Sequence, residues 1–401
     1  MRTKNVLMVV ADDMPEGGFT QEVMPTTFQH FAQRGVLFAN GYAVDPWCAP
    51  SRATLFTGLW VHDHGVVRGS VSTLEDTWYA NDLEADTIAT RAKAAGAKTC
   101  MIGKYMNGAK DARVPAGWER FFSYPPVAPG ADTYTIHVDG KAREIDRSAW
   151  NDTGLIFHQA SDFVKNNRDE PWLLYVAPNS PHVPPSATKE HEDDFDNVEL
   201  PKGPAYDPGD LPAPAPEIRA SYEGMLEECR DVDDGVAKLL GALRDTGQLE
   251  NTLVIFTSDN GYMYGEHGEI HKSQPWEESV GVPFAAAGPE LPGGVRTGAP
   301  AGHTDIPYTA LAALGADTTG MKGSDLRRFF APDWRTHLLV EHPHTGWALV
   351  TDGAWTYFEY PDGTKHLYDM LGDPHQTTNR AGEGLPEEST LQQKLSELKA
   401  G

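Results

Sequence analysis

The chain has 401 residues, and its 33 lysines and arginines against 58 aspartates and glutamates give a formal net charge of −25. Its 40% apolar and 23% charged residues are typical of a folded globular protein and exclude a chain that stays disordered. The acidic balance also excludes a general nucleic-acid binder, because binding a phosphate backbone needs clustered lysine and arginine.

An apolar, β-branched run at residues 6–10 predicts the first strand, which leads directly into Asp12 and Asp13. This run is far shorter than the core of a secretory signal, and no window reaches the roughly twenty apolar residues of a membrane span. The three cysteines of the chain are too few for a disulfide framework, which favours a reducing compartment. We therefore expect a cytoplasmic protein without a membrane segment, unless a leader precedes this numbering.

Similar apolar runs follow at residues 99–102, 172–177 and 253–257, and helical patterns separate them at residues 28–32, 88–95 and 222–240. Strands that alternate with helices predict an α/β fold with a large, mostly parallel sheet sandwiched by helices. A hairpin at residues 134–141, with Asp139-Gly140 at its turn, is expected to line the mouth of the site.

The sequence pattern changes after about residue 328, where the predicted elements become shorter. The segments are residues 338–340, 348–351 and 355–360, a Pro-Asp-Gly turn at 361–363 and a polar helix near 387–398. They predict a small antiparallel sheet with one helix. We therefore expect a large α/β domain at residues 1–328 that carries the site, and a small C-terminal subdomain at 329–401 packed on it.

Polar residues follow each of the four buried strands. Asp12 and Asp13 follow the first, Lys104 the second, His182 the third, and Asp259 and Asn260 the fourth. The carboxyl ends of parallel strands share one edge of a sheet, so these side chains should converge. Three carboxylates and an amide suit a hard cation such as Ca²⁺ or Mg²⁺. Taken singly, each pair could instead cap a helix or form a turn; the two pairs together favour metal binding.

The segment at residues 47–58 is the most informative stretch. Pro50 is well placed as the first residue of a short helix and Gly58 as the residue just past its end, which puts Cys48 at the N-terminus of this helix. Unpaired N–H groups there attract anions, and Arg52 projects along the same face. A nucleophile beside a fixed cation suggests oxyanion chemistry. The alternative is a buried, inert thiol, which explains Cys100 and Cys229 well but not the Cys-x-Pro-Ser-Arg spacing.

The string from Cys48 to Arg52 closely resembles the signature of the type I sulfatases, a family of the alkaline-phosphatase superfamily. Other pieces of the family pattern recur in order: Asp12-Asp13, Gly103-Lys104-Tyr105, Pro181-His182-x-Pro184, Asp259-Asn260-Gly261, Lys272 before residues 275–278, Leu367-Tyr368-Asp369 and Asp373-Pro374. The resemblance implies an alkaline-phosphatase-like fold. The Gly-Lys-Tyr-x-Asn form at residues 103–107 is similar to the subgroup of N-acetylglucosamine-6-sulfatases, which favours a carbohydrate sulfate.

The resemblance also implies a role for each matching residue. A formylglycine-generating enzyme would oxidise Cys48 to formylglycine, whose hydrated form attacks sulfur and then expels sulfate. Ca²⁺, with Mg²⁺ possible, would be bound by Asp12, Asp13, Asp259, Asn260 and residue 48. Asp259 would act as base and His182 as general acid, while Lys104 and Lys272 bind sulfate oxygens and Arg52 orients residue 48. Without the resemblance, a lone lysine is more often a solvated charge, and His182 could simply cap a loop.

The chain departs from the family pattern at two positions. Met106 stands where many members have a histidine that assists sulfate elimination, and Leu59 stands where an arginine commonly assists recognition by the modifying enzyme. The proton acceptor of the second step is therefore open. His267 is a candidate to border the pocket, whereas His62, His64, His271 and His303 are expected to be structural or surface groups.

Two other functions compete with sulfate-ester hydrolysis. The first is a phosphate- or phosphonate-ester hydrolase on the same scaffold. A phosphomonoester dianion would favour more positive charge or a second metal, and the sequence lacks the additional histidine-rich ligand set of a two-zinc phosphatase. A non-catalytic homologue would keep the metal and an unmodified Cys48. With a net charge of −25, the chain favours a small sulfate ester over a long sulfated polysaccharide.

Overall fold

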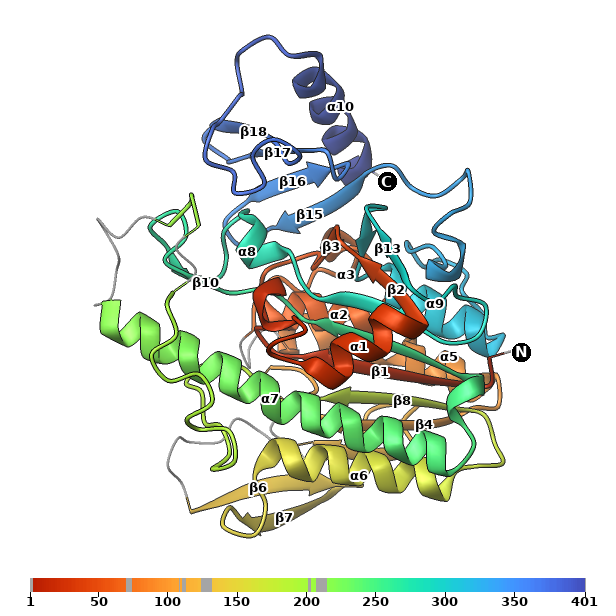
Figure 1. Ribbon diagram of the computed structural model, residues 1–401. Coiled ribbons are helices and arrows are strands. Elements are labelled where there is room, and N and C mark those ends of the chain that lie inside the picture. The colour runs from red at the N-terminus through yellow and green to blue at the C-terminus, as the bar shows by residue number, and fades with distance from the viewer. Residues whose placement is uncertain are drawn as a thin grey trace.

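The computed structural model describes residues 3–69, 74–107, 109, 113–123, 132–200, 203–206 and 215–400. Within them, ten strands form one large mixed sheet at the centre of the molecule (Figure 1). In their order across the sheet the strands are β13 (Val295–Thr297), β2 (Gly35–Phe38), β12 (Phe284–Ala287), β9 (Thr252–Ser258), β1 (Asn5–Ala11), β8 (Trp172–Ala177), β4 (Lys98–Gly103), β5 (Arg120–Ser123), β6 (Thr133–Val138) and β7 (Lys141–Asp146).

The five strands from β9 to β5 are parallel, and they include the four that the apolar runs predict. Every residue of β1, β8 and β9 is buried, as expected for strands covered on both faces. Ala11 pairs with Ser258, and Gly103 pairs with Ala177. The carboxyl ends of these strands are therefore level with one another, which is what brings the following residues together.

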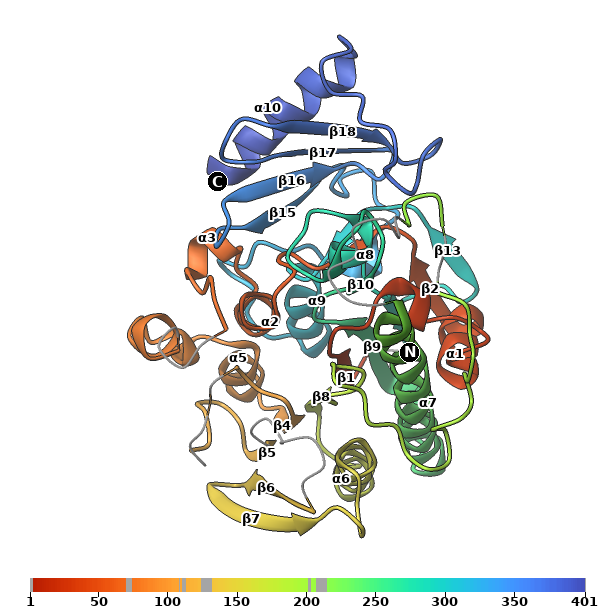
Figure 2. The same ribbon diagram turned by 90° about the vertical axis from the view of Figure 1, so that its left-hand side faces the viewer.

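Helices cover both faces of the sheet, as Figure 2 shows in a view along the strands. One face carries α1 (Pro25–Arg34), α6 (Asp152–Asn166) and α7 (Ala215–Asp245), and the other carries α2 (Cys48–Thr57), α5 (Ile88–Ala94) and α9 (Asp305–Leu314). Alternate residues of β1 divide between the two resulting cores: Leu7 and Val9 pack toward the first layer, Val6, Met8 and Val10 toward the second. The predicted fold class is thus confirmed.

Short elements connect the main ones. They are β3 (Gly41–Tyr42), β10 (Met263–Tyr264), β11 (Ile270–His271), β14 (Ala301–Gly302), α3 (Val61–His64), α8 (Glu277–Val280), the 3-10 helices η1 (Glu16–Gly18), η3 (Leu83–Ala85), η4 (Leu249–Asn251) and η5 (Leu326–Arg328), and the π-helical turn η2 (Leu74–Tyr79). The hairpin β10–β11 matters most for the site, because Lys272 follows β11 directly.

A second, antiparallel sheet stands above the first and is blue in Figure 1. Its strands are β15 (Leu338–His342), β16 (Trp347–Thr351), β17 (Trp355–Glu359) and β18 (Lys365–Asp369), and α10 (Pro386–Ala400) packs on it. The sequence predicts three of these strands and the helix but not β18. The core of this sheet includes Tyr42, Trp60 and Val280 from the large unit, so the two sheets share a packed interface.

The predicted hairpin forms as β6 and β7, but its expected position is wrong. Asp139 and Gly140 make the turn with positive φ angles of 48° and 84°. The backbone N–H of Asp139 donates to the carbonyl of Phe121 near the start of β5, which places this turn at the amino end of the parallel strands. The turn therefore lies at the edge of the sheet opposite to the carboxyl ends and does not line the site.

Candidate active site

Residues after four parallel strands meet at the carboxyl edge of the large sheet, the side that faces the viewer in Figure 2. Asp12, Asp13, Asp259 and Asn260 are at most 2% exposed. The backbone N–H of Asp13 donates to Asp259 Oδ1 at 3.1 Å, and Asn260 Nδ2 donates to Asp13 Oδ1 at 2.7 Å. The ends of β1 and β9 thus form one buried acidic floor, as the sequence predicts.

Helix α2 points its N-terminus at this floor. The helix begins at Cys48 with Trp47 as its N-cap and ends at Gly58, whose φ of 72° is the left-handed conformation that glycine adopts easily. Pro50 is therefore the third helical residue rather than the first, which is tolerated because the first N–H groups of a helix have no intrahelical partner. Cys48 Sγ lies 3.5 Å from Asp12 Oδ1 and 3.6 Å from Asp13 Oδ1.

Arg52 connects helix α2 to the ends of the strands. Its side chain is fully buried, with Nε donating to Asp259 Oδ2 at 2.8 Å and Nη1 donating to the carbonyl oxygen of Lys104 at 2.9 Å. Burial alone lowers the pKa of the guanidinium, but Asp259 and Asp12 outweigh it and raise that pKa. Arg52 is therefore a permanent charge that fixes α2 against two strand ends.

Two lysines reach the floor from opposite sides. Lys104 Nζ contacts Asp12 Oδ2; Lys272 Nζ contacts Asp13 Oδ1 and lies 2.9 Å from Cys48 Sγ. Burial opposes ionisation of all four groups, yet the mutual attraction raises the pKa of both lysines and lowers the pKa of both aspartates. The three cations of the cluster thus balance its three carboxylates, and the ammonium group beside Cys48 is a fixed donor that suits the binding of an oxyanion.

His182 is the most accessible member of the cluster, with its side chain 33% exposed. Its Nδ1 donates to the carbonyl oxygen of Val183 at 2.6 Å, which leaves Nε2 facing Asp13 Oδ2 at 3.6 Å. The ring is thus oriented with one nitrogen tied to the backbone and the other directed toward the pocket. That is the geometry expected of a proton donor to a leaving group.

The donor set fits a hard divalent cation. Ligand atoms of Asp12, Asp13, Cys48 and His182 all lie within 4.8 Å of one another. Asp13 Oδ2 is buried and has no hydrogen bond to the described residues, so one oxygen of the floor is still free to coordinate. Carboxylate oxygens favour Ca²⁺ or Mg²⁺ over zinc. Asp259 joins this floor through the Asp13 N–H and Arg52, each of which occupies one of its two oxygens.

The structure also shows the surroundings of three further residues, Met106, His267 and His303. Met106 is 4% exposed and packs in the core between the sheet and α2, so its side chain does not face the pocket. His267 stacks on Trp276 with ring centroids 3.9 Å apart, and its Nε2 lies 3.7 Å from Glu278, so its ring packs against residues outside the predicted site. The imidazole of His303 bridges Ser51 Oγ, at 2.8 Å, and the carbonyl oxygen of Ser258, at 2.9 Å. His303 therefore links α2 to β9.

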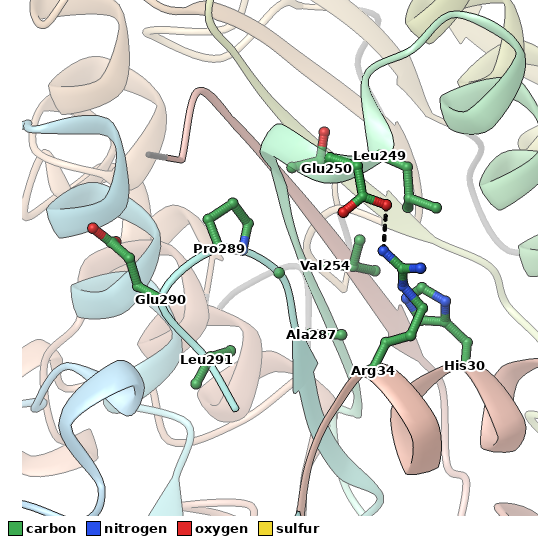
Figure 3. Close-up of a pocket in the computed structure, with 11 residues that line it drawn as sticks. His30, Arg34, Leu249, Glu250, Val254, Ala287, Pro289, Glu290 and Leu291 are labelled. Atoms are coloured by element: carbon green, nitrogen blue, oxygen red, sulfur yellow. Dashed lines mark hydrogen bonds and ion pairs between the residues drawn. The ribbon is translucent and has the colours of Figure 1, made fainter. Parts of the chain in front are cut away.

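A cavity of about 340 Å³ lies at the opposite edge of the sheet, where β9 begins (Figure 3). Its charged wall is an ion pair between Arg34 of α1 and Glu250 of η4, with side chains 47% and 64% exposed. Exposed, paired charges of this kind are common on protein surfaces. The buried cluster around Cys48 is therefore the better candidate for the active site.

An α/β sheet with a helix that begins at Cys48, an acidic floor and fixed cations at one edge is the arrangement expected of a hydrolase that acts on an oxyanion ester. The family model described as Sulfatase matches residues 4–316, well over half of the chain. The protein belongs to the sulfatase family. Its fold is shared with solved structures, among them one named as the sulfatase yidJ from Bacteroides fragilis, with a TM-score of 0.82 at 18% identity over 99% of this chain and 95% of that chain.

Curated relatives are similar over most of this chain. An extracellular sulfatase Sulf-1 homolog of Caenorhabditis elegans is 27% identical over 84% of the chain and 52% of its own length. An N-acetylglucosamine-6-sulfatase of Capra hircus is 29% identical over 88% of the chain and 68% of its own length. The chain thus spans about half of the first relative and two thirds of the second.

Solved structures share the fold at low sequence identity. A protein in complex with its substrate D-glucosamine-2-N,6-O-disulfate superposes with a TM-score of 0.81 at 19% identity, over 100% of this chain and 98% of that chain. A phosphonate monoester hydrolase from Silicibacter pomeroyi has a TM-score of 0.76 at 20% identity, over 99% and 95% of the two chains. None of the helices in the described part of the chain combines the length and the hydrophobicity that a membrane span requires.

Proposed function

We propose that the protein is a sulfatase that hydrolyses a sulfate monoester of a small carbohydrate, or of an aryl or alkyl alcohol, to the alcohol and sulfate. The observation that carries the proposal is the position of Cys48, at the N-terminus of α2 and in contact with Asp12, Asp13 and Lys272. The family match and the sulfatase relatives support the same reaction. The substrate bound in the structurally similar protein, a sulfated glucosamine, favours a sulfated sugar.

Cys48 is proposed to act as formylglycine, made by a formylglycine-generating enzyme. Burial, reinforced by Asp259, raises the pKa of the Cys48 thiol, so the unmodified side chain stays protonated and is a poor nucleophile. The hydrated aldehyde supplies an oxygen nucleophile together with a second hydroxyl whose deprotonation releases sulfate. The signature from Cys48 to Arg52 is intact, although Leu59 departs from the pattern beyond it.

A bound divalent cation, proposed to be Ca²⁺ with Mg²⁺ as the alternative, would neutralise negative charge on the sulfate. Asp12, Asp13, Asp259, Asn260 and residue 48 would hold it. Chelation with EDTA should abolish sulfate release and lower the melting temperature, because the buried carboxylates then repel one another; added Ca²⁺ should restore both. Unchanged activity and melting temperature after complete chelation would contradict the metal assignment.

The remaining residues have separable tasks. Lys104 and Lys272 hold two sulfate oxygens, and Arg52 fixes α2 so that residue 48 faces them. His182 donates its Nε2 proton to the leaving alkoxide while its Nδ1 stays bonded to the carbonyl of Val183. Asp259 accepts a proton from the attacking hydroxyl through the lone pairs that Arg52 and the Asp13 N–H leave unused.

The second candidate function is hydrolysis of a phosphate diester or phosphonate monoester, which the fold of the Silicibacter pomeroyi enzyme favours. The described residues around Cys48 form one candidate metal group and no second, histidine-rich one, which argues against a two-metal phosphomonoesterase but not against this candidate. Specificity constants for matched aryl sulfate, phosphate and phosphonate esters decide between the two. A clear preference for either phosphorus ester would overturn the sulfatase proposal.

The third candidate, a non-catalytic homologue, keeps Cys48 as a thiol. Mass spectrometry of the peptide around Cys48, from protein made in a host with the modifying enzyme, separates it from the main proposal. We expect the lighter aldehyde form to dominate. Only unmodified cysteine in protein from the native source would remove the mechanism. The expected cytoplasmic location stays a prediction, which fractionation of the native cells would test.

A further inference from the structure

Arg68 is an exposed cation in the loop that follows α3. It makes no ion pair with any carboxylate in the part of the chain that the structure describes, although the chain has a net charge of −25. Its Nε instead donates to Nδ1 of His344 at 2.8 Å, in the turn between β15 and β16. Figure 2 shows α3 beneath one end of β15, where these two segments meet.

Three contacts connect the surroundings of Arg68 to the segments that carry the candidate active site. The ring of His344 packs against the ring of Trp47 at a centroid distance of 4.5 Å, and Trp47 directly precedes Cys48. The indole of Trp47 donates to Ser273, the residue after Lys272. On the other side, a Cβ added at Gly69 would lie 3.4 Å from Cβ of Asn107, three residues beyond Lys104. Arg68 thus lies between the segments that carry Cys48 and Lys104.

The contact with His344 orients the guanidinium for an anion. Because Nε is engaged and no described residue bonds to Nη1 or Nη2, the edge formed by these two nitrogens can receive a ligand, and this edge matches two oxygens of a carboxylate or sulfate. Burial, together with the charge of Arg68, lowers the pKa of His344, which keeps the imidazole neutral and able to accept the bond.

We propose that Arg68, held by His344, binds a second anionic group of the substrate. The substrate class is then a sulfated sugar that carries a further sulfate or carboxylate group a few bonds from the ester that is cleaved. This inference rests on the proposed sulfatase function and narrows it. It also helps to explain how an acidic protein attracts a doubly anionic molecule, since Arg68, unlike Lys104 and Lys272, is not paired with a carboxylate among the described residues.

The test uses three glucosamine 6-O-sulfates that differ only at the C2 nitrogen: N-acetyl, N-sulfo and N-succinyl. The first adds no charge, the second adds a sulfate and the third a carboxylate. Sulfate release from C6 gives kcat/KM for each with the full-length, modified enzyme. We expect roughly tenfold higher kcat/KM for at least one anionic substrate than for the N-acetyl one, mainly through KM, since the anchor binds ground and transition states alike.

Arg68→Gln should remove most of this preference, and Arg68→Lys should retain part of it, because the charge stays while the fork is lost. The matched control is Arg143→Gln on the exposed strand β7, which removes the same charge far from the site and should keep the wild-type ratio. Higher ionic strength should reduce the ratio in the wild type and the control.

The outcomes separate this inference from the proposed function. Preference for the N-sulfo or the N-succinyl substrate tells which anion the site takes. Equal kcat/KM for all three substrates, or a preference that survives in Arg68→Gln, overturns the role of Arg68 and leaves the sulfatase function intact. No sulfate release from these or from simple aryl sulfates overturns both.

Discussion

The two edges of the large sheet carry charge in opposite ways. At the carboxyl edge, Asp12, Asp13, Asp259 and Arg52 are buried and share partners in one cluster. At the amino edge, charges such as Arg34 and Glu250 are exposed and form isolated pairs (Figure 3). Exposed pairs are worth about 0–1 kcal/mol, whereas breaking a buried pair costs about 3–5 kcal/mol. Because burying charged groups is costly, the edge that keeps them buried is the one that we expect to carry the catalytic residues.

The largest effect is expected when the carboxylate of Asp259 at the carboxyl edge is neutralised, with Glu250 at the amino edge as the matched control. Asp259→Asn should lower kcat/KM by at least roughly a thousandfold, because it removes the proposed base and a metal ligand. It should also lower the free energy of unfolding by about 3 kcal/mol, since Arg52 loses its closest carboxylate. Glu250→Gln should change stability by less than about 1 kcal/mol and leave kcat/KM at the wild-type value.

Circular dichroism and denaturant titration check that both variants fold, and calcium titration checks metal binding. Near-normal turnover by Asp259→Asn would refute the assignment of the carboxyl edge. A large loss of stability or of kcat/KM in Glu250→Gln would show that charges at the amino edge matter as much as those at the carboxyl edge.

The second expected effect is smaller and comes from a comparison of two lysines, Lys272 at the site and Lys98 at the amino edge. Lys272→Met should lower kcat/KM by roughly a hundredfold or more, because a fixed charge beside residue 48 is lost from the transition state. Lys98 at the start of β4 lies 3.4 Å from Glu170 and 3.9 Å from Glu119, with its side chain 41% exposed, so Lys98→Met should leave kcat/KM unchanged. Steady-state kinetics on an aryl sulfate measures both, and equal losses would contradict the assigned role of Lys272.

The large sheet and the gathering of polar residues at one edge could be predicted from the sequence. Four continuous apolar runs define buried parallel strands, and level carboxyl ends bring Asp12, Lys104 and Asp259 together without knowledge of side-chain packing. Lys272 has no such local signal, because it follows a two-residue strand in a hairpin. Only the family resemblance indicates it.

What could not be predicted depends on contacts between distant segments. Ser51 and His303 are 252 residues apart, and nothing in either neighbourhood indicates their hydrogen bond. The hairpin β6–β7 was predicted, but its place followed from the register against β5, which puts Asp139 beside Phe121. Whether Met106 faces the pocket or the core likewise depends on how α2 packs on the sheet.

The smallest expected effect separates stability from activity at low pH. Burial, with help from Arg34 and Arg244, lowers the pKa of His30 from 6.5 to about 4. Between these values the unfolded chain binds a proton that the folded chain does not, so the stability that neutral His30 contributes is present above pH 6.5 and is lost as the pH falls toward 4. At pH 5 this loss is up to about 2 kcal/mol from one histidine.

His30→Gln should therefore flatten the fall of unfolding free energy between pH 7 and pH 5 by about that amount. Because His30 lies at the amino edge, in the wall of the cavity in Figure 3, the pH profile of kcat/KM should not move. Denaturant titrations and kinetics at matched pH values test the two halves. His30 touches none of the groups around Cys48, so a shifted pH profile of kcat/KM in His30→Gln would mean that the two edges are coupled. An unchanged pH dependence of the unfolding free energy would mean that other groups cause the acid sensitivity of the fold.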